Sequence, residues 1–281
     1  MVVVRLFRAN LRKLIRRPAT WVTFLLLLAL LVLIFVAVTA AAKQTTRPAE
    51  ALASKAVITF PAAYKGVLSI ILGIGGMLSV TYGAAIAGSE WTWGTLKAAI
   101  ARGEGRVRYV VFGYAGVAAF AIAGLLLAFA LGVLAAMAGS TFLGISLSGM
   151  NDATALGQMP ELLARGALAL SMNAALGFAI ATIARSQLAG IGVGIGAYFA
   201  EGIAGVFLPD VIQWFPFAAS SAVVARTSTA AAGGGGGGGF GGGGAAGTTL
   251  DPNTAVIVVI VWLVAALVVA SAWTERAEIS G

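Results

Sequence analysis

Residues 21–38 read WVTFLLLLALLVLIFVAV, a run in which no side chain carries a charge. A helix needs about 20 predominantly apolar residues to cross a hydrocarbon core of about 30 Å. The run exceeds the about 7 to 15 apolar residues typical of a secretory signal. We therefore expect a retained membrane span rather than a cleaved leader.

Five further stretches have the same character. Because their apolar runs are continuous rather than alternating, they fit helices and not the strands of a membrane barrel. We expect an all-α integral membrane protein in which residues 1–281 form a single transmembrane domain. The predicted spans are Thr20–Ala42, Pro61–Ser89, Tyr109–Ser140, Leu162–Ala184, Leu188–Leu208 and Thr254–Trp273.

The composition excludes several kinds of chemistry. Hydrophobic residues make up 60% of the chain. Charged residues make up only 10%, whereas soluble domains contain about 25% charged residues. The absence of cysteine and histidine excludes disulfides, thiolate or imidazole metal sites, and histidine bases. We expect no catalytic residue, metal site or bound cofactor in this chain, which is then not itself an enzyme.

The distribution of basic residues predicts the orientation. Twelve of the 18 Lys and Arg residues flank the odd-numbered spans on their N-terminal side or follow the last span. This side is expected to be cytoplasmic, because short cytoplasmic segments carry an excess of Lys and Arg. We expect a multi-pass protein of the cell membrane with both termini in the cytoplasm. The +8 net charge is clustered beside apolar segments, so no nucleic-acid partner is expected.

Residues 1–19 have the pattern of an amphipathic helix. The basic side chains Arg5, Arg12 and Arg16 fall opposite an apolar face, and Pro18 is expected to end the helix. Such an elbow helix lies in the cytoplasmic headgroup layer, with its arginines facing anionic lipid. The apolar face comprises Val3, Val4, Phe7, Leu11, Leu14 and Ile15.

The outer connections contain turn signals. Asn151, Asp152 and Pro160 mark turns in the third connection. In residues 209–253, Pro209 and Pro216 break an aromatic, apolar segment, which predicts short extracytoplasmic helices before the last span. Residues 233–247 are mostly glycine; with no GK[ST] ending, they indicate a flexible tether and not a phosphate loop.

Glu201 is an ionisable residue inside the fifth predicted span, which makes it a candidate for a translocation path. A purely structural alternative is that Glu201 is protonated or pairs with Arg165. The glycines at alternate positions from Gly190 to Gly196 lie in the same span. They indicate close helix packing rather than a dinucleotide fingerprint, and Gly73, Gly75 and Gly76 invite the same interpretation.

Residues 90–108 form a charged, aromatic segment between the second and third spans. Thr95–Arg102 can form two helical turns, with Thr92 or Thr95 as the cap and Gly103 in the left-handed position. Leu96 and Ile100 share one face of this helix, while Lys97 and Arg102 project elsewhere.

The pattern in this segment resembles the cytoplasmic loop of ABC-2-type transporter permeases. It consists of Gly88, Glu90, the aromatic Trp91, Gly94, Thr95, Leu96 and Lys97, followed by a basic stretch. The elbow helix, the six spans and the proline-broken outer helices also match that family. The resemblance implies a permease subunit that dimerises with a second permease and binds separate cytoplasmic ABC ATPase subunits, which hold the ATP and Mg²⁺. It also implies that the coupling residues are Glu90, Trp91, Gly94, Thr95, Leu96, Lys97 and Ile100.

We therefore expect the membrane subunit of an ATP-driven exporter. No GxxxxGK[ST] motif occurs in the chain, so a partner must supply the P-loop. Two alternatives remain at this point. One is a gradient-driven secondary transporter, for which Glu201 would be the relevant carboxylate, and the other is a non-transporting scaffold or assembly protein.

Overall fold

The computed structural model describes residues 2–44, 54–224 and 250–277, with side chains from Arg8 onward. The side chain of Phe7 and the glycine-rich segment 233–247 lie outside this description. The described part is almost entirely helical and contains no strand. Six helices are long and apolar enough to span a membrane, which confirms the predicted all-α membrane fold. They are α2 (Pro18–Gln44), α4 (Ala62–Thr92), α6 (Arg106–Phe142), α7 (Ala153–Ala184), α8 (Gln187–Phe207) and α11 (Pro252–Arg276).

Shorter elements lie at the ends of these spans. A helix precedes the first span, and two short helices lie between the fifth and sixth, as expected from the proline breaks. The short elements are α1 (Val2–Ile15), α5 (Thr95–Ala101), a 3₁₀ turn η1 (Ser148–Asn151), α9 (Pro209–Ile212) and α10 (Pro216–Ala222).

The prediction of a turn at Pro160 was wrong. The α7 helix starts at Ala153 and contains Pro160 in its interior. Its start is fixed by Asp152, whose carboxylate accepts a hydrogen bond from the backbone N–H of Ala155 at 2.7 Å. A proline in a helix interior removes one backbone hydrogen bond. Here the capped first turn and the long helix that follows outweigh that loss.

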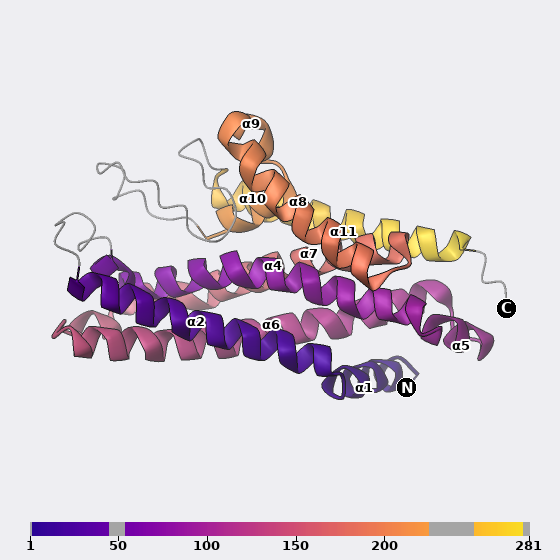
Figure 1. Cartoon of the computed structure of the whole chain (residues 1–281), viewed down its shortest axis with the longest axis horizontal. Coiled ribbons are helices and arrows are strands. Elements are labelled where there is room, and N and C mark those ends of the chain that lie inside the picture. Colours follow the sequence, from indigo (N-terminus) through magenta and orange to yellow (C-terminus); the bar gives the residue numbers. More distant parts are fainter. Residues whose placement is uncertain (1, 45–53, 225–249, 278–281) are drawn as a thin grey trace.

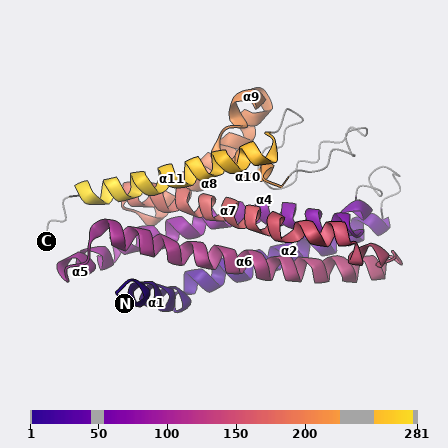
Figure 2. The same ribbon diagram turned by 180° about the vertical axis from the view of Figure 1, so that it is seen from behind.

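The spans form three layers. Helices α4 and α7 lie in the middle, with α2 and α6 on one side and α8 and α11 on the other (Figures 1 and 2). Buried residues make up 72% and 67% of the most apolar windows of α4 and α7, against 17–33% for the other four spans. The four outer helices therefore present long apolar faces to lipid, while α4 and α7 are enclosed by protein.

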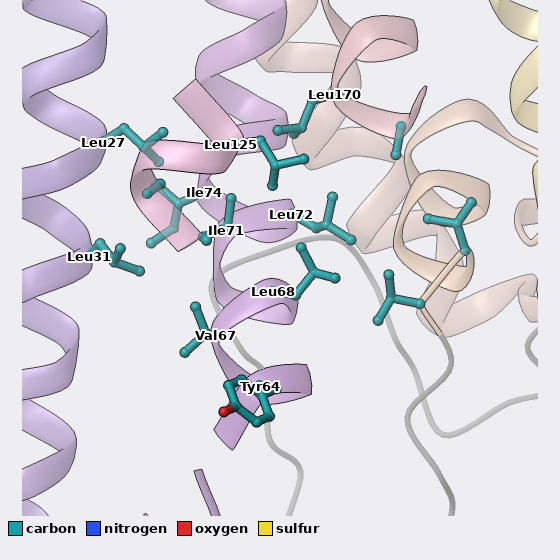
Figure 3. Close-up of a cluster of buried hydrophobic side chains, with 14 of the residues drawn as sticks. Leu27, Leu31, Tyr64, Val67, Leu68, Ile71, Leu72, Ile74, Leu125 and Leu170 are labelled. Atoms are coloured by element: carbon teal, nitrogen blue, oxygen red, sulfur yellow. The ribbon is translucent and has the colours of Figure 1, made fainter. Parts of the chain in front are cut away.

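Branched aliphatic side chains fill the space between the layers. Leu27 and Leu31 of α2 point toward Val67 and Ile71 of α4, and Leu170 of α7 joins them from the other side (Figure 3). All five are buried. This cluster connects the α2 layer to the central pair.

Glycine allows the two central helices to approach each other closely. A Cβ on Gly83 would lie 2.0 Å from the carbonyl oxygen of Ala174, and one on Gly177 would lie 1.9 Å from that of Val80. In lipid, where helix association depends on close packing, small residues are typical of such crossings.

The packing role predicted for the fifth-span glycines is confirmed for half of them. A Cβ on Gly190 would clash with Ala181, and one on Gly194 with Val80. Gly192 and Gly196 face open space instead. The four-residue spacing of the first pair places both on the face that packs against the central helices.

The first helix and residues 90–108 lie at the same end of the bundle. Helices α1 and α5 and the C-terminal end of α11 lie together there, and α9 and α10 lie away from it (Figure 1). The segment that resembles a coupling loop is thus adjacent to the N-terminal helix.

We predict that Gly177→Ala lowers the unfolding temperature in detergent, because the added methyl group meets a backbone carbonyl and overpacking costs about 1–3 kcal/mol. The matched control is Gly192→Ala, where a Cβ meets nothing within 4 Å. Alanine exceeds glycine in helix propensity by about 1 kcal/mol, so the control should be neutral or stabilising. Equal unfolding temperatures for the two variants would contradict the close crossing.

Candidate functional site

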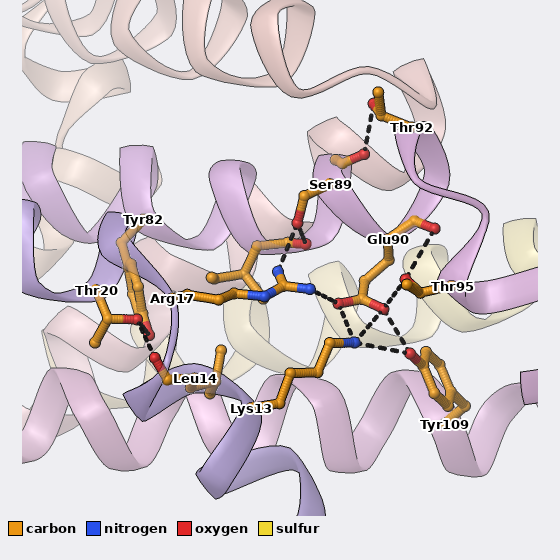
Figure 4. Close-up of polar contacts among 12 residues, drawn as sticks. Lys13, Leu14, Arg17, Thr20, Tyr82, Ser89, Glu90, Thr92, Thr95 and Tyr109 are labelled. Atoms are coloured by element: carbon orange, nitrogen blue, oxygen red, sulfur yellow. Dashed lines mark hydrogen bonds and ion pairs between the residues drawn. The ribbon is translucent and has the colours of Figure 1, made fainter.

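Glu90, in the last turn of α4, is the centre of a charged cluster at the end of the bundle (Figure 4). Its carboxylate contacts Lys13 Nζ at 2.6 Å and Arg17 Nη2 at 2.7 Å. It also accepts hydrogen bonds from the hydroxyls of Thr95 and Tyr109, each at 2.5 Å. The Glu90 cluster, defined as these five residues, thus joins α1, the turn before α2, α4, α5 and α6.

The turn between α1 and α2 positions the two cations. The hydroxyl of Thr20 donates to the carbonyl of Leu14 at 2.8 Å and lies 3.1 Å from the hydroxyl of Tyr82, which fixes this turn on α4. Arg17 is then directed at the end of α4, where it also donates to Ser89 Oγ at 2.6 Å. Arg17 is only 8% exposed, so its charge depends on these protein contacts.

Lys13 is half-buried beside the same carboxylate. Burial lowers the pKa of its ammonium below the usual value, although the Glu90 carboxylate opposes this change by raising it. The Lys13 ammonium also lies over the ring of Tyr109, 5.8 Å from its centroid. Lys13 therefore reaches the edge of the cluster, while Arg17 is enclosed within it.

The two tryptophans of this segment contact cations of the same chain. The Arg17 guanidinium lies 5.1 Å from the centroid of the Trp93 ring, and the Arg185 guanidinium lies 5.2 Å from that of Trp91. Such contacts stabilise by about 0.5–2 kcal/mol depending on their exposure. Trp91 thereby connects the end of α4 to the turn between α7 and α8.

The predicted cap of the short helix was wrong. Gly94, with φ at +65°, occupies the N-cap of α5, and no side chain caps it. The Thr95 hydroxyl donates to Glu90, and the Thr92 hydroxyl donates to the carbonyl of Gly88 at 3.0 Å. Both hydroxyls are thus engaged with α4. Gly94 is required because the chain reverses there through the left-handed region.

The C-terminal end of α5 agrees with its prediction. Gly103 has φ at +86°, and its N–H donates to the carbonyl of Ile100 at 2.9 Å. The N–H of Glu104 donates to the carbonyl of Ala99 at 3.3 Å. These two bonds form a Schellman motif, which ends the helix after two turns.

The face of α5 that carries Leu96 and Ile100, two of the coupling residues implied by the resemblance, is turned toward the protein. Leu96 is 3% exposed and Ile100 is half-buried, so the apolar stripe packs on the protein itself. Lys97, Ala98 and Ala101 are exposed instead. The spacing of Leu96 and Ile100 identified one face of the helix, but it could not show that this face covers α4 and α6.

Gly88 has a packing role in this region. A Cβ on Gly88 would lie 2.3 Å from the Cα of Gln187, so the first turn of α8 crosses the end of α4 at this point.

Arg106 is a basic residue whose position the topology of the membrane alone could explain. In the structure its guanidinium also donates to the carbonyls of Glu275 at 2.6 Å and Ala277 at 2.9 Å. It therefore holds the C-terminal end of α11 to α6.

Sequence reasoning missed three members of the Glu90 cluster. Lys13 and Arg17 are four residues apart, a spacing that places them on one helix face, but they were interpreted as topology charges. Because the helix breaks between Lys13 and Arg17, the sequence does not show that both side chains point toward Glu90. Tyr109 gives no signal in the sequence, because nothing distinguishes it from other aromatic residues near the membrane surface.

Some side chains of the elbow helix are buried against the bundle, and others are exposed. Leu14 is buried against α6, where its Cδ1 would lie 2.9 Å from a Cβ on Gly116. Leu11 is half-buried, while Arg12 and Arg16 are exposed. Helix α1 is thus fixed to the bundle on one side and presents basic side chains on the other.

Glu201 is 8% exposed, but its carboxylate is already engaged. Oε1 accepts a hydrogen bond from the backbone N–H of Ala218 in the first turn of α10. The alternative pairing with Arg165 is wrong, because Arg165 contacts Glu161 and donates to Asn253 Oδ1 at 2.8 Å. Glu201 therefore connects α8 to the short helix α10.

The contacts of Glu90 connect helices to one another. In the Glu90 cluster the carboxylate is paired with two cations and accepts hydrogen bonds from two hydroxyls. Among the described residues, no group of three or more acidic, histidine or cysteine side chains could hold a metal ion. The cluster instead couples the position of α5 to α1, α4 and α6.

We predict that Glu90→Gln loosens the N-terminal helix, because removing one partner of a buried ion pair costs about 3–5 kcal/mol. The chain has no cysteine, so a single Leu14→Cys substitution provides a clean maleimide probe of this packing. Its labelling rate should rise by at least about tenfold in the Glu90→Gln background, since each 1.4 kcal/mol changes an equilibrium tenfold.

The matched control is Glu161→Gln, which disrupts the partly exposed pair with Arg165. Surface pairs contribute about 0–1 kcal/mol, so this change should leave the introduced thiol protected. Equal labelling in both backgrounds would show that the Glu90 cluster does not hold α1.

No protein-family model and no curated protein sequence matches this chain.

Proposed function

We propose that this chain is the membrane-spanning permease subunit of an ATP-driven ABC-type exporter. It functions as a dimer with a second permease subunit in the cell membrane, with both termini in the cytoplasm. Separate cytoplasmic ATPase subunits bind ATP and Mg²⁺ and contact the end of the bundle that carries α1 and α5. The protein itself performs no catalysis.

The observation that carries this proposal is the Glu90 cluster. A partner that displaces α5 also displaces Glu90 through the Thr95 hydroxyl, and Glu90 holds the N-terminal helix through two cations. Glu90 belongs to α4, which packs against α2, α6, α7 and α8. A movement at α5 is therefore transmitted through one rigid element to five of the six spans, α4 included.

The surface available to the ATPase is the outer face of α5. It comprises the exposed Lys97, Ala98 and Ala101, flanked by Trp93, which is 63% exposed. Trp93 is the anchor of this surface, because rigid aromatic side chains are enriched in protein interfaces. Leu96 and Ile100 lie on the other face of α5, where they attach this surface to the bundle.

We predict that Ala98→Asp abolishes copurification of a coexpressed ATPase, such as one encoded beside this reading frame, because it places a buried charge in the interface. The control is Ala153→Asp, the same change on an exposed residue at the opposite end of the bundle. Glu90→Gln should retain the ATPase but lose the increase in ATP hydrolysis that the intact complex shows.

The alternatives give different outcomes in the same experiment. If no nucleotide-binding protein copurifies under any condition, the exporter proposal fails in favour of a gradient-driven transporter or a scaffold. If Glu90→Gln leaves ATP hydrolysis in the complex unchanged, α5 is a docking point and not the coupling element.

We predict that the single substitutions Arg102→Cys and Ser146→Cys label from opposite sides of the membrane. Both positions are exposed, and Arg102 precedes α6 whereas Ser146 follows it. With the basic end in the cytoplasm, a membrane-impermeant maleimide added to intact cells should label only the Ser146→Cys variant. Labelling of the Arg102→Cys variant alone would reverse the orientation and place α5 beyond the reach of a cytoplasmic ATPase.

A further inference from the structure

A cleft lies between the outer helices α2 and α6, with α4 and α7 as its floor. Phe24 and Phe120 on the two rims are half exposed, while Ser79 and Leu170 on the floor are buried. The cavity volume is only about 50 Å³, which is small beside the about 300–1,000 Å³ of drug-sized sites, so the cleft suits a slender ligand.

The mouth of the cleft faces the bilayer. It opens between α2 and α6, whose most apolar windows are only 17% and 33% buried. In a membrane such surfaces contact lipid tails. Hydrocarbon chains are therefore the molecules that meet this opening.

The two ends of the cleft differ in polarity. Thr20 and Tyr82 lie at one end (Figure 4), and Leu27 and Gly75 lie at the other. On each helix these ends are seven residues apart, or about 10 Å at 1.5 Å per residue. The neighbouring Trp21 is 51% exposed, and tryptophan is enriched at the headgroup level. The polar end thus lies near the membrane surface and the apolar end lies deeper.

Two hydroxyls on the cleft wall lack partners. Thr23 and Ser79 line the space, and neither hydroxyl takes part in the hydrogen bonds found among the described residues. A hydroxyl left without a partner in an apolar setting is unfavourable by about 1–3 kcal/mol. A ligand that brings a hydrogen-bond acceptor to this level would satisfy them.

We propose that the cleft binds a single acyl chain whose head end carries a carbonyl or carboxyl group. The carbonyl oxygen accepts hydrogen bonds from Ser79 and Thr23, and the chain runs down the floor toward Leu27 and Leu170. The chain can belong to a bilayer phospholipid or to a free single-tailed amphiphile, because both offer the same chemistry.

The test uses the full-length protein in nanodiscs with two photoactivatable probes. One is a diazirine-bearing fatty acid, and the other is a phosphatidylcholine that carries the same diazirine chain. After irradiation, mass spectrometry should locate adducts in residues 20–27, 75–82 and 120–124. Adducts from the phosphatidylcholine identify a bilayer source, and adducts from the fatty acid alone identify a free amphiphile.

Filling the cleft should abolish this labelling. A Cβ on Gly124 would contact only Phe24, at 3.8 Å, so Gly124→Leu extends into the space and should lose most of the adduct. Ala121→Leu on the half-exposed rim is a milder version should the first variant fold poorly. The matched control is Ala123→Leu, an exposed neighbour on α6 that should label like the wild type.

Removing the two hydroxyls with Thr23→Val and Ser79→Ala keeps the shape of the cleft and should weaken labelling by both probes. The proposal is overturned if adducts occur in proportion to exposure along α2, α8 and α11. It is also overturned if Gly124→Leu and Ala121→Leu label as strongly as Ala123→Leu.

Discussion

The buried carboxylate of Glu90 is the constraint on which one end of this protein depends. Two cations approach it from the N-terminal segment and two hydroxyls from α5 and α6. A buried charge is tolerated only when it is paired and its remaining lone pairs are satisfied. With four donors converging on Glu90, a shift of any one of these elements disturbs the others.

The crossing of α4 and α7 places α4, the helix that carries Glu90, in contact with most of the other spans. In lipid, apolar surface alone does not drive helices together, so contact between backbones determines which helices are central. Gly83 and Gly177 permit that contact, and they place the helix that carries Glu90 in the middle of the bundle. A charge cluster on an outer helix would be connected to fewer spans.

Much of the fold could be predicted from the sequence, because the length and polarity of a span are local properties. The cluster could be predicted only in part, because Glu90 and Thr95 occur in a recognisable pattern while Lys13, Arg17 and Tyr109 come from distant positions. The direction of Leu96 was missed for a related reason. Helical spacing identifies an apolar face, but only tertiary packing determines whether that face covers the protein or a partner. Pro160 shows the converse, since a strong local signal was overridden by a capped long helix.

The two buried carboxylates, Glu90 and Glu201, have comparable roles at different short helices. Glu90 connects α4 to α5 with cations present, whereas Glu201 connects α8 to α10 through a backbone N–H. A gradient-driven transporter normally contains broken midplane helices or a membrane carboxylate that can exchange its partner for an ion or a proton. Glu201 is instead engaged with the first turn of α10, so releasing it would undock that helix from α8. This geometry favours a structural role for Glu201, like the role that Glu90 has at the other short helix.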